Sequence, residues 1–88
     1  MFFIITYDIA DEQRLNKVRK ILRKYFNWVQ NSVFEGEITL SKLEKCIFEL
    51  KEVINEKEDS IYFYQVENYK GLKKTILGIA KNLTDNII

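Results

Sequence analysis

Histidine and proline are absent from the 88 residues of this chain, cysteine occurs once and glycine three times. Without histidine there is no imidazole base, no His–Cys zinc site and no histidine-activated nucleophile. The single Cys46 excludes an intramolecular disulfide and a cysteine metal cluster, and its place among apolar helix residues predicts a small buried side chain. The absence of proline is typical of a chain made mostly of regular elements.

Long apolar runs are also missing, and no basic leader precedes the first apolar segment. We therefore expect a cytoplasmic protein without membrane contact. Acidic residues are missing between Glu12 and Glu35, a stretch that holds six cations. These are Arg14, Lys17, Arg19, Lys20, Arg23 and Lys24. A solvated helix with cations near its C-terminus explains this pattern, and so does a face that binds a polyanion.

Large apolar side chains are abundant for so short a chain, with six Phe, five Tyr and one Trp. A domain of this length buries only a modest share of its surface. The surplus of aromatic surface predicts a homo-oligomer that covers the remainder.

Apolar periodicity predicts the element order β-α-β-β-α-β. The first half holds a predicted strand over 2–8, a helix over 11–26 with Asp11 as N-cap, and a strand over 28–34. A turn at Glu35-Gly36 leads to a predicted strand over 37–40. A helix begun by the capping box Ser41 and Glu44 follows, and then a strand over 60–66. This order predicts an α+β, ferredoxin-like fold, in which a four-stranded antiparallel sheet carries both helices on one face.

The tail divides from this unit, so we assign residues 1–66 to a ferredoxin-like domain and residues 67–88 to a C-terminal strand and tail. Residues 73–78 are predicted to form a fifth strand. It has no obvious place in its own sheet, and the sheet edge of a dimer mate would accommodate it. Residues 79–88 are expected to form a short helix or to fray.

The first strand ends at Asp8, and the basic helix follows directly. A carboxylate at the tip of a buried strand, next to many cations, indicates a site for a metal ion and a phosphodiester. The alternative is that Asp8 only caps a turn or the first helix.

Several gapped motifs carry a resemblance to a known family. They are Tyr7-Asp8-Ile9, then Asp11, Arg14 and Lys17-Val18, then Val29-Gln30 and Ser32-Val33-Phe34-Glu35-Gly36, and finally Asp59-Ser60-Ile61 with Phe63-Tyr64. Over about residues 2–78 the chain resembles the small CRISPR-associated nuclease family, the second of the two near-universal CRISPR adaptation proteins.

The resemblance implies a ferredoxin-like homodimer whose last strand packs on the other subunit's sheet. It also implies a divalent metal, usually Mg²⁺, held by the strand-one Asp8 of both subunits. Members of the family are described as metal-dependent endonucleases acting on RNA or duplex DNA. They also form the central dimer of the complex that integrates spacer DNA, where they bridge an integrase partner.

Magnesium prefers oxygen ligands and commonly takes one or two carboxylates together with waters and phosphate oxygens. Since one carboxylate binds Mg²⁺ weakly, a two-fold axis beside Asp8 would supply one ion per dimer with two ligands. Arg14, Lys17 and Arg19 are the candidate phosphate contacts, and binding through them should weaken with salt.

Three further residues are candidates for support of the site. Ser32 and Phe34 would help to position substrate or line the dimer groove, with a sheet hydrogen bond and core packing as their alternatives. Tyr7 is expected to be structural. Some nuclease members carry a basic residue where this chain has Trp28, which favours a non-catalytic scaffold over the nuclease.

Three functions thus stay open: an Mg²⁺-dependent endonuclease, a homodimeric DNA-binding scaffold for an integrase, and a ferredoxin-like small-molecule regulatory domain. The low glycine content disfavours the third, because such domains usually bind their ligand on a glycine-rich loop.

Overall fold

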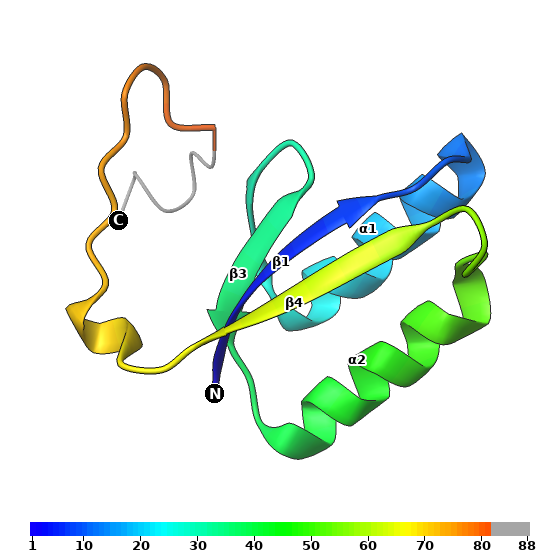
Figure 1. Cartoon of the computed structure of the whole chain (residues 1–88), viewed down its shortest axis with the longest axis horizontal. Helices are drawn as coiled ribbons and strands as arrows, with labels where there is room; N and C mark the ends of the chain where they lie inside the picture. Colours follow the sequence, from blue (N-terminus) through cyan, green and yellow to red (C-terminus); the bar gives the residue numbers. More distant parts are fainter. Residues whose placement is uncertain (82–88) are drawn as a thin grey trace.

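A computed structural model describes residues 1–81, and its elements follow the predicted order (Figure 1). They are β1 (Phe2–Asp8), α1 (Glu12–Tyr25), β2 (Asn27–Gln30), β3 (Val33–Glu37), α2 (Leu40–Val53), β4 (Ser60–Val66) and a 3₁₀ turn, η1 (Tyr69–Gly71). Neither α-helix in this part of the chain is long and apolar enough to cross a membrane.

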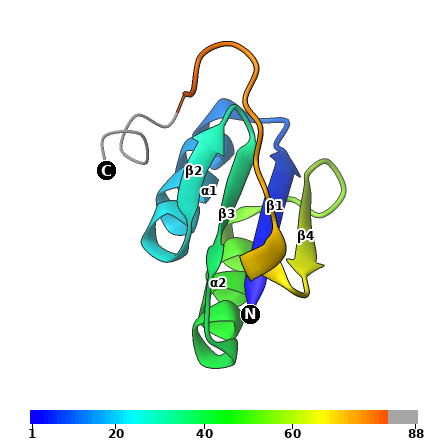
Figure 2. The same cartoon turned by 90° about the vertical axis from the view of Figure 1, so that its left-hand side faces the viewer.

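The four strands form one antiparallel sheet in the order β2-β3-β1-β4. Figure 2 shows α1 and α2 together behind this sheet. The two central strands, β1 and β3, are thus flanked by β4 and β2, as a split βαβ unit requires. The predicted α+β, ferredoxin-like fold is confirmed.

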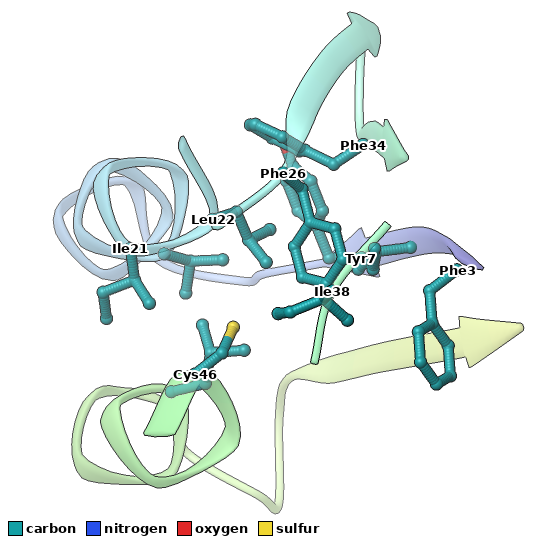
Figure 3. Close-up of a cluster of buried hydrophobic side chains, with 11 residues drawn as sticks. Phe3, Tyr7, Ile21, Leu22, Phe26, Phe34, Ile38 and Cys46 are labelled. Carbon is teal, nitrogen blue, oxygen red and sulfur yellow. The ribbon is translucent and has the colours of Figure 1, made fainter. Parts of the chain in front are cut away.

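The core lies between the sheet and the two helices. Alternate residues of β1, namely Phe3, Ile5 and Tyr7, are buried against the helices. In Figure 3, Cys46 of α2 points toward the α1 side chains Ile21 and Leu22. Cys46 is 0% exposed, so the predicted small buried side chain is confirmed, and this burial raises the pKa of its thiol to about 12.

The prediction of the hairpin turn at Glu35-Gly36 was wrong, because the turn lies at Asn31 and Ser32, between β2 and β3. Asn31 has a φ of 39°, a left-handed conformation that asparagine tolerates better than most residues. Gly36 instead lies inside β3, where a Cβ would stand 3.4 Å from the Phe26 ring. That spacing is an ordinary van der Waals contact, whereas the φ of 156° at Gly36 is one that residues with a side chain rarely adopt, so the backbone favours glycine here.

The start of the second helix also differs from the prediction. The expected strand over 37–40 is replaced by the end of β3 at Glu37 and the first residue of α2 at Leu40. Thr39 rather than Ser41 caps α2, since its hydroxyl accepts a hydrogen bond from the Lys42 amide at 3.3 Å. Two hydroxyl residues lie two positions apart, and the spacing to Glu44 favoured the wrong one. The N-cap of α1, Asp11, is as predicted.

After β4 the tail leaves on the side of the sheet away from the helices (Figures 1 and 2). Tyr69 stacks on Phe2 with ring centroids 4.9 Å apart, and Lys74 Nζ lies 2.7 Å from Glu35 Oε2. Within the chain itself, residues 73–78 do not pair as a strand, as far as the described residues extend. The expectation for residues 79–88 falls mostly outside the described residues.

Candidate functional site

Asp8 is the last residue of β1, and its register partner on β4 is Ser60. The side chains of β1 alternate, so Asp8 shares a face with Ile4 and Thr6, opposite the buried Tyr7. That is the face of the sheet turned away from the helices. Asp8 is exposed, and its carboxylate makes no hydrogen bond or ion pair to any residue within 1–81. Both oxygens are therefore available to an external group.

The neighbouring acids are occupied in other ways. Asp11 caps α1, accepting a hydrogen bond from the Arg14 amide at 2.9 Å. Asp59 is buried. Among residues 1–81 no three carboxylate or thiol side chains gather closely enough to hold a metal ion. In this part of the molecule, Asp8 contributes a single carboxylate.

Asp59 lies immediately before β4 and was not among the site residues predicted from the sequence. Its side chain is 0% exposed, and its two oxygens accept four hydrogen bonds. Oδ1 accepts from the Ala10 amide at 2.9 Å and from Arg14 Nη2 at 3.2 Å. Oδ2 accepts from Arg14 Nε at 2.8 Å and from the Asn55 amide at 2.9 Å. The signal for this role was the Asp59-Ser60-Ile61 motif of the family resemblance.

Arg14 was predicted as a phosphate contact, and the structure gives its guanidinium a protein partner. The hydrogen bonds to Asp59 raise the pKa of Arg14 and hold the pKa of Asp59 well below its ordinary range. The Arg14 side chain is 25% exposed, and Nη1 makes none of these hydrogen bonds. This leaves donors that an incoming anion could reach.

Arg19, another predicted phosphate contact, lies beside the β2–β3 turn. Its Nε donates to the Tyr7 hydroxyl at 3.4 Å, and that hydroxyl donates to the Asn31 carbonyl at 3.3 Å. The same carbonyl accepts from Trp28 Nε1 at 3.1 Å. Tyr7 is therefore both a core residue and the group that holds Arg19 near the turn.

Lys17 lies on the exposed side of α1, together with two cations that were not singled out as site residues, Lys20 and Arg23. In residues 1–81 none of the three has an ion pair or hydrogen-bond partner through its side chain. Their spacing of three residues puts them on one side of the helix. The gap in acidic residues was the sequence signal for this cationic surface, which we call the α1 ridge (Lys17, Lys20, Arg23).

Ser32 and Phe34 are brought to β1 in different ways. The Ser32 carbonyl accepts a hydrogen bond from the Tyr7 amide at 3.2 Å, which places the β2–β3 turn one residue from Asp8. Phe34 is 0% exposed and pairs in register with Ile5. Its ring, 6.0 Å from that of Tyr7, packs in the core and does not reach the surface.

Comparison with known families and structures agrees with this geometry. The family model described as CRISPR associated protein Cas2 matches residues 1–75. A CRISPR-associated endoribonuclease Cas2 of Thermodesulfovibrio yellowstonii is 62% identical over 99% of this chain and 98% of its own length. That of Methanosarcina acetivorans is 50% identical over the full length of both chains.

A crystal structure of Streptococcus pyogenes Cas2 superposes with a TM-score of 0.75 at 35% identity, covering 86% of this chain and 99% of that one. At the level of the family, the prediction of a nuclease is confirmed, and the regulatory-domain alternative loses its support. The register of β1, the fold and the matches over the whole length lead to one conclusion: this chain belongs to the Cas2 family of CRISPR-associated proteins.

Proposed function

We propose that this protein is a homodimeric, divalent-metal-dependent endoribonuclease of the CRISPR system, with Asp8 of each subunit as metal ligand and catalytic residue. The observation that carries the proposal is the position of Asp8: an exposed, unengaged carboxylate at a strand end, on the sheet face away from the helices. RNA is the proposed substrate because the relatives from Thermodesulfovibrio yellowstonii and Methanosarcina acetivorans are named endoribonucleases.

The apolar character of the same sheet face supports a dimer. Tyr62 and Tyr64 stand on it with 57% and 52% of their surface exposed, and they stack on each other at 6.0 Å. The tail adds Leu77 and Ile79, which are 94% and 78% exposed. Isologous packing of two such faces would bury this surface and bring the two Asp8 residues toward a common axis.

The chemistry of the donors fits magnesium. Carboxylate oxygens are hard ligands, and Mg²⁺ is commonly held by one or two of them with waters and phosphate oxygens completing the shell. When bound, the metal would polarise the scissile phosphate and make water a better nucleophile, which suits a chain without histidine. We propose one ion per dimer, shared by the two Asp8 carboxylates.

The chain's own cations would bind and orient the nucleic acid. Lys17 would contact phosphates from the α1 ridge, and Arg19 would do so from its place against the Tyr7 hydroxyl. Arg14 would offer the donors that Asp59 leaves unused. These groups face a sugar–phosphate backbone and not base edges, so we expect little sequence specificity.

The experiment compares wild type with Asp8→Ala on a single-stranded RNA at matched protein and Mg²⁺ concentrations. We expect kcat to fall about 100-fold or more, since the ligand of the metal is lost. The melting temperature should stay unchanged because the exposed Asp8 side chain makes no hydrogen bond or ion pair within residues 1–81. Equal cleavage by Asp8→Ala and wild type would overturn the assignment.

A second function, a DNA-binding scaffold that bridges copies of an integrase partner, is favoured by the α1 ridge and by Trp28 at the position of a basic residue in some nuclease members. It predicts that Lys17→Ala weakens binding of duplex DNA and lowers the salt dependence by about one counterion per site. Asp8→Ala should leave this binding intact. Loss of DNA binding in Asp8→Ala, with Lys17→Ala unaffected, would count against the scaffold.

A further inference from the structure

We infer that Asp59 is a positioning residue for Asp8: its buried carboxylate fixes the backbone on both sides of the β1 end and orients Arg14 beside it. The inference rests on the proposed role of Asp8 and extends it to a second carboxylate that would touch neither metal nor RNA.

The connections run from Asp59 to both strands that meet at Asp8. Along the chain, Asp59 immediately precedes Ser60, the register partner of Asp8. Just beyond the end of β1, the amide of Ala10, two residues after Asp8, donates a hydrogen bond to Asp59 Oδ1. The segment that carries Asp8 is thus held at its strand pair and again just beyond it.

The Asp59 carboxylate also accepts hydrogen bonds from both helical regions, from Asn55 after α2 and from Arg14 in α1. Oδ2 accepts a hydrogen bond from the Asn55 amide, which follows the end of α2. The two contacts with Arg14 come from the first turn of α1 and use two nitrogens of one planar guanidinium, a geometry that restricts rotation. Four donors on two oxygens leave the carboxylate little freedom to move.

The location of the hydrogen-bond donors indicates that Asp59 does more than stabilise the fold. Every donor to Asp59 comes from residues 10, 14 or 55, and two of these lie in the segment just after Asp8. Displacement of this segment would misplace the Asp8 oxygens, even in a folded protein. Small displacements of catalytic groups reduce turnover strongly, while binding of substrate through distant phosphates is little affected.

The test uses the full chain with Asp59→Asn, which keeps the shape of the side chain and removes its charge and one acceptor. Glu58→Gln is the matched control: it removes the same charge one residue away, from a side chain that is 53% exposed and 3.8 Å from Arg14. Four quantities are measured below the onset of unfolding: Mn²⁺ affinity by water-proton relaxation, amide exchange of Ala10, and kcat and KM on single-stranded RNA.

We expect Asp59→Asn to lose about tenfold or more in Mn²⁺ affinity and in kcat, with KM changed less than about twofold and faster exchange at Ala10. Glu58→Gln should stay within about twofold of wild type. Should Asp59→Asn fail to fold, Arg14→Lys serves instead. It keeps the positive charge and both backbone hydrogen bonds but loses the two-nitrogen contact. Measured without RNA, it should lower the Mn²⁺ affinity and speed the exchange of the Ala10 amide.

Two outcomes separate the inference from the proposed function. If wild type binds Mn²⁺ and a folded Asp59→Asn binds it equally and has the same kcat, Asp59 is only structural and the inference is overturned. An unchanged Mn²⁺ affinity and unchanged Ala10 exchange in Arg14→Lys, where Asp59→Asn is unfolded, overturn it as well. If wild type itself neither binds Mn²⁺ nor cleaves RNA, the proposed function fails, and with it the inference.

Discussion

Two aspartates near the same end of the sheet differ completely in environment. Within residues 1–81, Asp8 projects from the sheet face and its carboxylate has no hydrogen-bond or ion-pair partner, whereas Asp59 is buried and accepts four hydrogen bonds. A carboxylate that is saturated with donors is held in its charged form and has little capacity for a further ligand. At the scale of single residues, the fold thus leaves Asp8 able to bind an external ligand and uses Asp59 to hold neighbouring backbone and Arg14 in place.

The first prediction concerns the acid stability of this buried pair. Arg14 lowers the pKa of Asp59 in the folded protein, while in the unfolded chain an aspartate titrates near 3.9. The ion pair therefore contributes its full stability above pH ~4, and this contribution is lost as the pH falls through the lower, folded-state pKa.

Thermal unfolding of wild type and Asp59→Asn between pH 2 and 7 measures this contribution. The difference in melting temperature should be largest and constant above about pH 5 and should shrink below about pH 4. Glu58→Gln, made at the exposed neighbour, should change the melting temperature little at neutral pH. A difference between wild type and Asp59→Asn that does not change with pH would contradict the prediction.

At the scale of elements, the capping of α2 decides where the connection from β3 ends. Thr39 has an extended backbone with a ψ of 159°, and its hydroxyl accepts from the Lys42 amide. Ser41 lies in the first helical turn, where Thr39 Oγ1 at 3.4 Å is the one hydrogen-bond partner of its hydroxyl within residues 1–81. The cap therefore belongs to the residue at the bend of the chain.

The second prediction compares two alanine substitutions at these hydroxyl residues. Thr39→Ala removes the acceptor for an unpaired helix amide and should lower the free energy of unfolding by about 1 kcal/mol. Ser41→Ala should change it by less than about 0.5 kcal/mol, because alanine favours the helix and no cap is lost. Urea unfolding of both variants measures the difference. A larger loss in Ser41→Ala than in Thr39→Ala would restore the capping box predicted from the sequence.

At the scale of the whole molecule, the sheet has one face covered by helices and one face with exposed aromatic residues. Such a face is energetically acceptable in a small protein when a second copy covers it. The tail lies on the same side, so the fifth strand predicted over residues 73–78 would be close to a partner's sheet edge in such a dimer. Assembly and the proposed shared metal site then depend on the same surface.

The third prediction tests that surface with two charge insertions. Tyr64→Lys puts an unpaired charge on the sheet face and should raise the dimer dissociation constant by at least about tenfold, because burying the ammonium is costly. Phe48→Lys replaces a residue that is 65% exposed on α2, away from this face, and should leave the dimer intact. Sedimentation equilibrium distinguishes the two. A monomeric Phe48→Lys beside a dimeric Tyr64→Lys would place the interface on α2.

The amino-acid sequence was enough to determine the fold and the helix over α1 with its Asp11 cap, because these depend on local apolar periodicity and on a cap next to the helix in the chain. It also placed Asp8 at the end of a strand, where the structure has it, and the role of Asp8 stays a prediction. The hairpin turn was misplaced because Glu35-Gly36 has the local chemistry of a turn. The structure instead uses Gly36 inside β3, where its φ of 156° favours glycine.

The partners of Arg14 and Phe34 were decided only in three dimensions. Arg14 and Asp59 are 45 positions apart, and no local pattern reports that burial brings them to 2.8 Å. From the sequence, a cation near a strand end such as Arg14 is a reasonable phosphate contact. In the structure the buried carboxylate of Asp59 requires a charged partner, and Arg14 is that partner. Periodicity determines which face of an element is apolar, whereas tertiary packing determines which of the polar groups are left for function.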